Sequence, residues 1–99
     1  MYTKDQKEIL INNIKVNVYK SFKDFDNIKN VINDISIFLN ISHWVHTYSV
    51  HIIDNKLKLI CMTKWDNDND VNTLVFDIKE IRRRLKLDKI VNNICTKLV

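Results

Sequence analysis

The stretch YSVHIIDNKLKLIC, residues 48–61, contains the clearest structural signal in the chain. Two runs in which apolar and polar residues alternate flank the pair Asp54-Asn55, and alternation of this kind is typical of half-buried strands. Asn and Asp tolerate the left-handed backbone that a tight turn requires. The stretch therefore predicts a β-hairpin. The residues that alternate with their neighbours in this way are Tyr48, Val50, Ile52, Leu57, Leu59 and Cys61.

The residues before the hairpin contain two different periods. Ile14, Val16 and Val18 alternate with polar residues, which favours a strand, although a helix over residues 5–20 is the alternative. From Ser21 onward the apolar spacing changes to three and four residues, which predicts a helix. Its apolar stripe would be Phe25, Ile28, Ile32, Ile35 and Leu39, with Asp24 or Asp26 as the N-cap.

After the hairpin, a polar link over residues 66–72 leads to a second predicted helix. Asn72 or Thr73 would cap it, and its apolar stripe would be Leu74, Ile78, Ile81 and Leu85. Asp88 then predicts the start of a short final helix. This last helix would point Ile90, Val91, Ile94 and Leu98 inward.

The predicted order of elements is therefore β-α-β-β-α-α, with no linker or repeat in between. Such an order predicts an α+β, two-layer fold in which a small, mainly antiparallel sheet packs against helices. The chain has 99 residues, of which 45% are apolar and 28% charged, so we expect one domain, residues 1–99, with a packed core.

The absence of glycine from the sequence excludes several kinds of chemistry. Phosphate-binding loops, dinucleotide fingerprints and nucleophile elbows need glycine for positive φ or for close approach of the backbone. No nucleophile and base stand in a recognisable arrangement either. We therefore expect no enzyme activity, no cofactor and no small-molecule substrate. No membrane-spanning run or leader pattern is visible, so a cytoplasmic protein is expected, with a nuclear protein as the alternative.

Three sets of side chains could in principle form a metal or redox site, but none has the sequence pattern that such a site requires. His43, His46 and His51 match no zinc spacing with Cys61, so no metal site is predicted. The acidic run over residues 66–70 resembles a calcium loop but has Val71 at the position that needs glycine. Both cysteines, Cys61 and Cys95, are expected to be small apolar core residues.

Positive charge is concentrated in the last third of the chain. The chain carries a net charge of +4, and residues 71–99 hold seven basic against three acidic residues. A basic helix with its apolar stripe turned to the core is suited to a polyanion, because each neutralised phosphate releases counterions. The predicted RNA-binding residues are Lys79, Arg82, Arg83, Arg84, Lys86 and Lys89.

Five aromatic side chains are candidates for stacking on unpaired bases. Stacking of this kind contributes about 1 to 3 kcal/mol per base. The five are Tyr19, Phe22, Trp44, Tyr48 and Trp65. Core packing is expected for most of them, and the two tryptophans, at strand ends, are the favoured candidates.

The segment TLVFDIKEIRRRLKLDKI, residues 73–90, resembles the basic helix of the eukaryote-specific large-subunit ribosomal protein family numbered twenty-two. Without gaps, its apolar and basic positions fall on those of the family pattern, and the hairpin resembles the family's central strands. The matching positions are Leu74, Phe76, Lys79, Ile81, Arg83, Arg84, Leu87 and Ile90.

The resemblance implies a structural constituent of the large ribosomal subunit. Its partners would be ribosomal RNA and neighbouring ribosomal proteins, with no membrane involved, and the basic residues from Lys79 to Lys86 would contact RNA phosphates. An alternative is a small adaptor that uses the basic helix or the sheet face to bind an acidic protein. A third is electrostatic docking on an anionic membrane surface.

Overall fold

The computed structural model describes residues 3–63 and 70–98, with the backbone alone for residue 70 and residues 92–98. Its element order is α1 (Lys4–Asp24), α2 (Ile28–Ile41), β1 (Val45–Ile53), β2 (Lys56–Thr63), β3 (Asp70–Asp77) and α3 (Ile78–Leu98). The three strands form one antiparallel sheet in the order β1-β2-β3. The α+β class and the antiparallel sheet are confirmed, whereas the predicted order β-α-β-β-α-α is wrong.

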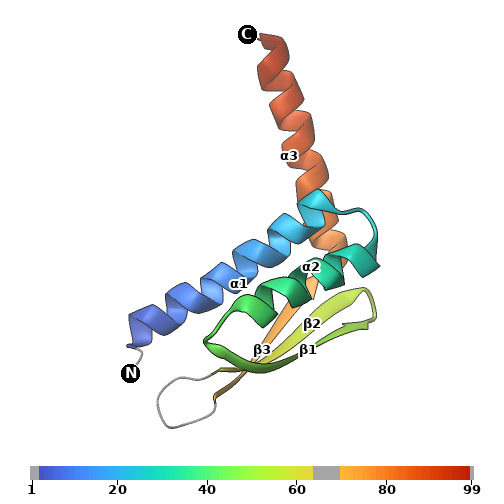
Figure 1. The fold of residues 1–99 in the computed structure, drawn as a ribbon. Helices are drawn as coiled ribbons and strands as arrows, with labels where there is room; N and C mark the ends of the chain where they lie inside the picture. The colour runs from blue at the N-terminus through green and yellow to red at the C-terminus, as the bar shows by residue number, and fades with distance from the viewer. Residues whose placement is uncertain (1–2, 64–69, 99) are drawn as a thin grey trace.

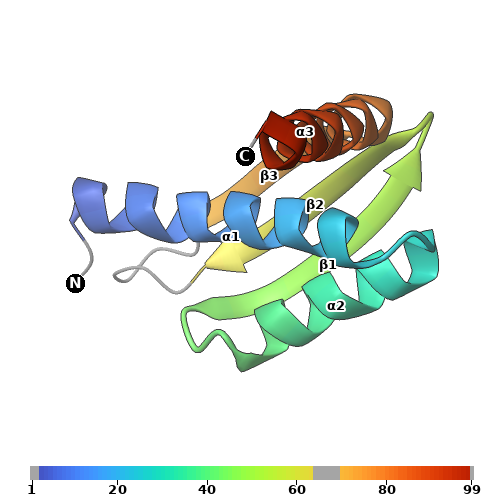
Figure 2. The ribbon, with the colours of Figure 1, turned by 90° about the horizontal axis from the view of Figure 1, so that it is seen from above.

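Helices α1 and α2 lie side by side over one face of the sheet (Figures 1 and 2). The central strand β2 alternates strictly, and its four inward residues Leu57, Leu59, Cys61 and Thr63 are fully buried beneath the helices. The fully buried residues Ile14 and Val18 of α1 and Ile35 of α2 belong to the same core. The two layers are therefore joined by one continuous apolar cluster.

The predicted hairpin is present with the predicted turn. Val50 lies opposite Leu59, and Ile53 lies opposite Lys56 across the turn. Asp54 and Asn55 have φ values of 50° and 61°, so the two turn residues occupy the left-handed region without glycine.

Residues 14–18 are helical, which makes the strand predicted there wrong and the alternative helix right. Ile14 and Val18 are fully buried, whereas Val16 between them is 67% exposed. This is the spacing of a helix face rather than of a strand. Thr3 and Gln6 form a capping box at the start of α1: the Thr3 hydroxyl accepts from Gln6 N at 3.1 Å, and Thr3 N donates to Gln6 Oε1 at 2.8 Å.

The next helix begins later than predicted. Residues 21–24 belong to α1, and Asn27 caps α2 by accepting a hydrogen bond from Lys29 N at 2.8 Å. Asp24 and Asp26 therefore do not cap α2. Of the predicted stripe, Ile35 and Leu39 are buried in the core, and Phe25, Ile28 and Ile32 are partly buried.

The predicted helix beginning at Asn72 or Thr73 is wrong, because residues up to Asp77 form strand β3. Leu74 and Phe76 are partly buried while Val75 is 58% exposed, so burial alternates along this strand. β-Branched residues at every second position favour this strand over a helix.

A new helix at Asp88 is also wrong, because α3 runs without a break through this residue to Leu98. Ile90 and Val91 are 46% and 55% exposed and do not point into the core. The side chains of Ile94 and Leu98, predicted inward with them, lie outside the described residues. The later part of α3 projects away from the sheet and the other two helices (Figure 1).

Candidate nucleic-acid interface

The first turns of α3 are held against the core. The carboxylate of Asp77 accepts a hydrogen bond from Glu80 N at 3.1 Å, which satisfies one of the free amides at the start of the helix. Ile78 and Ile81 are 8% and 9% exposed, and Leu85 is partly buried against the same cluster. Because these three apolar side chains face the core, the opposite side of α3 is open to solvent.

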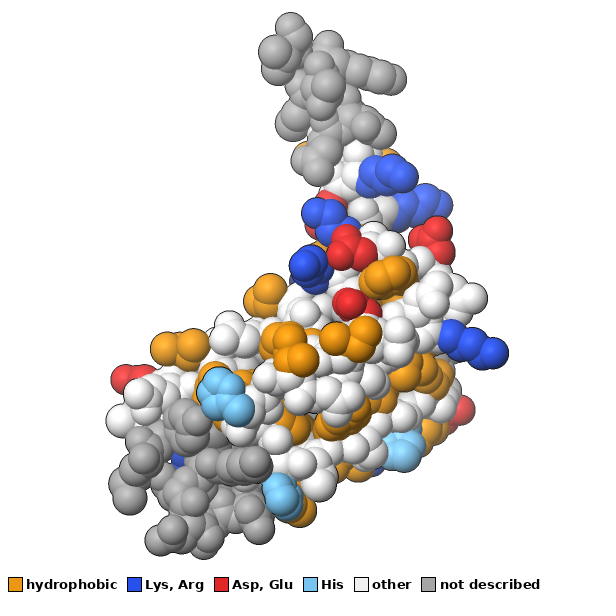
Figure 3. Space-filling model, viewed as in Figure 1, with side chains coloured by type: hydrophobic (Ala, Val, Ile, Leu, Met, Phe, Trp, Pro, Cys, Tyr) orange, Lys and Arg blue, Asp and Glu red, His pale blue; other side chains and the backbone are white. Residues whose placement is uncertain are grey.

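All six predicted RNA-binding side chains lie on α3 and are exposed. These are Lys79, Arg82, Arg83, Arg84, Lys86 and Lys89. In the space-filling view, basic side chains gather where α3 leaves the body of the molecule, with acidic side chains among them (Figure 3). The six cations consequently differ in how much of their charge is free.

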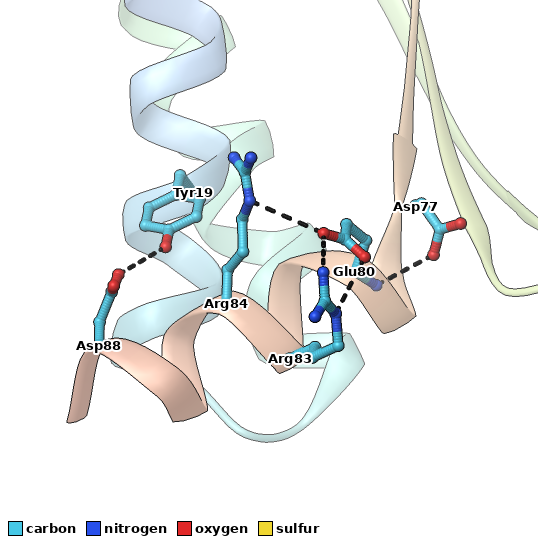
Figure 4. A network of polar contacts seen from close by, with 6 residues as sticks. All are labelled: Tyr19, Asp77, Glu80, Arg83, Arg84 and Asp88. Carbon is cyan, nitrogen blue, oxygen red and sulfur yellow. Dashed lines mark hydrogen bonds and ion pairs between the residues drawn. The ribbon is translucent and has the colours of Figure 1, made fainter. Parts of the chain in front are cut away.

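Glu80 engages two of the three consecutive arginines (Figure 4). Arg83 donates from Nη2 to Glu80 Oε1 at 2.7 Å and from Nε to Oε2 at 3.2 Å. Arg84 Nε lies 3.7 Å from the same Oε1. The hydrogen bond from Arg83 lowers the pKa of Glu80 below its ordinary value, and the same bond raises the pKa of Arg83. Part of the charge of this arginine run is therefore neutralised within the helix.

The other side of α3 faces the end of α1 across a groove. Arg82, Lys86 and Lys89 line it from α3, and Lys23 lines it from α1. Arg82 donates from Nη2 to the backbone carbonyl of Asp26 at 3.1 Å. None of these four cations forms an ion pair with a carboxylate in the part of the chain that the structure describes.

The groove has a volume of about 810 Å³. The apolar residues that line it are Tyr19, Phe22, Phe25, Leu85 and Val91. The carboxylates of Asp26 and Asp88 also line it, so four cations stand against two acids. The lining of the groove is therefore amphipathic, because it combines three aromatic side chains with a net positive charge.

Tyr19 of α1 and Asp88 of α3 both line the groove, and their side chains point toward each other (Figure 4). The phenol hydroxyl donates to Asp88 Oδ2 at 3.1 Å. Desolvation raises the pKa of Tyr19, and the hydrogen bond and the charge of Asp88 raise it further, while the charge of Arg84 lowers it. The phenol thus stays protonated at neutral pH and remains a hydrogen-bond donor.

Of the lining residues that could contact RNA, Lys23 and Phe25 are among those missing from the sequence-based site. Lys23 is four positions after Tyr19. If the helix considered over residues 5–20 is extended by one turn, these two side chains lie on the same face of the helix. The capping box of Thr3 and Gln6 was the signal that favoured such a helix.

Among the described residues, neither favoured stacking candidate lies at the basic surface. Trp44 is 7% exposed and belongs to the core, so the prediction for this tryptophan is wrong, and Trp65 lies outside the described residues. Phe22 is 4% exposed, and Tyr48 is partly buried, with its hydroxyl 3.4 Å from the carbonyl of Ser36. Tyr19, which lines the groove, is the candidate that remains at the basic surface.

The side chains considered as metal ligands differ in their exposure to solvent. His43, His46 and His51 are exposed, whereas Cys61 is fully buried. Over residues 3–63 and 70–98, no cluster of three or more His, Cys, Asp or Glu side chains suited to a metal ion occurs. Most of the acidic run over residues 66–70 lies outside the described residues.

Burial raises the pKa of Cys61 to about 11, as expected for an apolar core thiol. The side chain of Cys95 is not among those described.

Comparison of the chain with protein-family models, with curated proteins and with solved structures gives no match. Among the described helices, none combines the length and the apolar character needed to cross a bilayer. The class that the fold and site define is an α+β protein with a basic groove between two helices.

Proposed function

We propose that this protein binds RNA through the basic groove formed by α3 and the end of α1. The observation that carries the proposal is the set of four exposed cations without carboxylate partners on adjoining surfaces of two helices, Lys23, Arg82, Lys86 and Lys89. A polyanion that neutralises them releases condensed counterions, which favours binding at physiological salt.

A place in the large ribosomal subunit is the more specific form of this proposal. The charge of α3 supports this form more strongly than the fold does, because the resemblance predicts a helix over residues 73–90. The first part of that segment is strand β3, and α1 occupies the place of the expected first strand. Sedimentation of the native protein with large subunits, and its release at high salt, would support this form. A protein that stays in the supernatant at low salt would exclude it.

Salt dependence of RNA binding tests the proposal itself. Fluorescence anisotropy with a labelled RNA should give an association constant that falls linearly in a log–log plot against salt. Lys86→Glu should weaken binding roughly tenfold at low salt and reduce the slope by about 0.7 or more, because a phosphate contact is lost and a repulsive charge is added.

Lys4→Glu is the matched control for this test. It makes the same change of charge at the opposite end of α1, where the side chain is exposed and the acidic substitution suits the helix N-terminus. It should leave the affinity within about twofold if the groove is the site. Equal losses in both variants would mean that net charge alone drives binding, and affinity independent of salt would overturn the proposal.

A second candidate function is supported by the distal part of α3. Leu87, Ile90 and Val91 are 47%, 46% and 55% exposed on a projecting helix, and exposed aliphatic side chains of this kind suit an amphipathic protein partner. The adaptor hypothesis predicts a complex with an acidic protein that survives nuclease treatment. Loss of the complex on nuclease treatment would favour RNA instead.

A further inference from the structure

The lining of the groove is more apolar than the binding of phosphates alone requires. A surface that binds only the sugar–phosphate backbone needs cations, whereas this one places them around Phe25, Leu85 and the buried Phe22. In an RNA duplex the base faces are stacked and cannot enter such a groove. A single strand can turn its bases away from its phosphates and use both features at once.

We propose that this groove binds an unpaired nucleotide of a single-stranded RNA segment, with the base on the rings of Phe25 and Tyr19 and the phosphates on the surrounding cations. This inference rests on the proposed function and adds to it the class of RNA that is bound.

The spacing of the cations fits a short run of phosphates. Arg82 and Lys89 are seven positions apart on α3 with Lys86 between them, which is an axial distance of roughly 10 Å at 1.5 Å per residue. This length allows contacts to more than one phosphate of the same strand. Lys23 stands across the groove on α1, so a strand in the groove would be contacted from both sides.

The aromatic side chains are partly pre-arranged for stacking. Tyr19 is only partly exposed, and its hydroxyl donates a hydrogen bond to Asp88 at 3.1 Å, which limits the movement of the side chain. Phe25 is partly buried at the C-cap of α1, and its N–H donates to the carbonyl of Ser21 at 3.0 Å. A ring that is already ordered loses little conformational freedom on binding. The engagement of Asp88 with Tyr19 also leaves the lining cations free of this carboxylate.

An abasic strand separates contacts to bases from contacts to phosphates. We would measure the anisotropy of a short labelled single-stranded RNA, of an abasic strand of equal length and of the same RNA annealed into a duplex, at several salt concentrations. The intact strand should bind at least about fivefold more tightly than the abasic strand for each stacked base. It should also bind more tightly than the duplex, and the log–log salt slope should be the same for both single strands, because their phosphates are identical.

Two substitutions remove the aromatic faces while keeping apolar side chains. Tyr19→Leu and Phe25→Leu should each reduce affinity for the intact strand toward that of the abasic strand and leave the salt slope unchanged. Phe38→Leu on α2 is the matched control, because Phe38 is also partly buried but does not line the groove, and it should bind RNA normally. Circular dichroism of each variant establishes that it is folded.

Photo-crosslinking gives a readout that does not depend on affinity. A strand containing 4-thiouridine should crosslink within the tryptic peptides of residues 16–20 and 24–29, which contain Tyr19 and Phe25. Equal binding of intact and abasic strands, or unchanged binding by both leucine variants, would overturn the base site while leaving the proposed function in place. If no strand shows salt-dependent binding, both the base site and the proposed RNA-binding function are overturned. Both are also overturned if an acidic protein displaces every strand and is the partner that forms a stable complex.

Discussion

The phenol hydroxyl of Tyr19 donates a hydrogen bond to Asp88 Oδ2 at 3.1 Å, across 69 positions of the sequence. This contact joins the end of α1 to α3 at a point beyond Leu85, which packs against the core. Both residues line the groove, so this contact connects the projecting helix to the candidate site.

Removing this hydroxyl should loosen α3 locally. Tyr19→Phe keeps the ring and removes the donor, so we expect faster amide exchange around Asp88 and little change at Ile78 and Ile81, which are packed in the core. Hydrogen exchange read by mass spectrometry measures both regions in one experiment. Unchanged exchange around Asp88 would show that this bond does not hold the helix.

Releasing the arginines from Glu80 should strengthen RNA binding. Glu80→Gln removes the carboxylate that accepts from Arg83 at 2.7 Å and that lies near Arg84. The positive potential of α3 beside the groove then rises, so affinity at low salt should increase, and the magnitude of the log–log slope should increase only if Arg83 or Arg84 reaches a phosphate outside the groove. Asp5→Asn, in the first turn of α1, makes the same change of charge far from the groove and should have no such effect. Weaker binding by Glu80→Gln would contradict the geometry of the site.

The helical assignment of α1 can be tested with two neighbouring apolar residues. Ile14 is fully buried and Val16 is 67% exposed. Ile14→Ala should lower the free energy of unfolding by about 2 to 5 kcal/mol, because it leaves a cavity in the core. Val16→Ala should change it by less than about 0.5 kcal/mol. Denaturant titration measures both, and equal losses would indicate a strand with the two residues on one face.

The turn of the hairpin should be sensitive to the residue at position 55. Asn55 has a φ of 61°, which costs a residue with a Cβ and no short polar side chain about 1 kcal/mol. Asn55→Ala should therefore destabilise the protein by roughly that amount, whereas Asn55→Gly should not. Thermal unfolding distinguishes the two, and equal stability of both variants would be inconsistent with a left-handed residue at this position.

Cys61 should react slowly in the native protein. Burial raises the pKa of its thiol to about 11, so little of the reactive thiolate is present at neutral pH. In a Cys95→Ser variant, alkylation at pH 8 should be slow in buffer and fast in denaturant. Fast labelling of the folded protein would contradict the burial of this side chain.

The same thiol makes a pH-dependent contribution to stability. Its pKa is higher in the folded state than in the unfolded state, so the folded state binds the proton more tightly. The contribution is therefore fully present below about pH 9 and is lost as the pH rises toward about 11, by roughly 2 to 3 kcal/mol in total. Comparison of Cys61→Ala with the parent chain across this range isolates the effect.

The sequence by itself determined the hairpin, its turn and the inward residues of β2, because alternation over a tight turn needs no information from elsewhere in the chain. It also determined that Lys79 to Lys89 form the most basic segment. It did not distinguish helix from strand at residues 14–18 and 71–77, because short β-branched runs fit both periods. Only packing decided these: Ile14 and Val18 share one buried helix face, and β3 completes the sheet beside β2.

The groove was decided by tertiary structure alone. Tyr19, Lys23 and Phe25 are far from Arg82 and Lys86 in sequence, and they meet because Ile78 and Ile81 turn one side of α3 into the core beside the end of α1. A run of charges along a helix indicates where positive potential lies. Which of its members are neutralised, and which aromatic side chains they surround, depends on contacts between segments that no local pattern encodes.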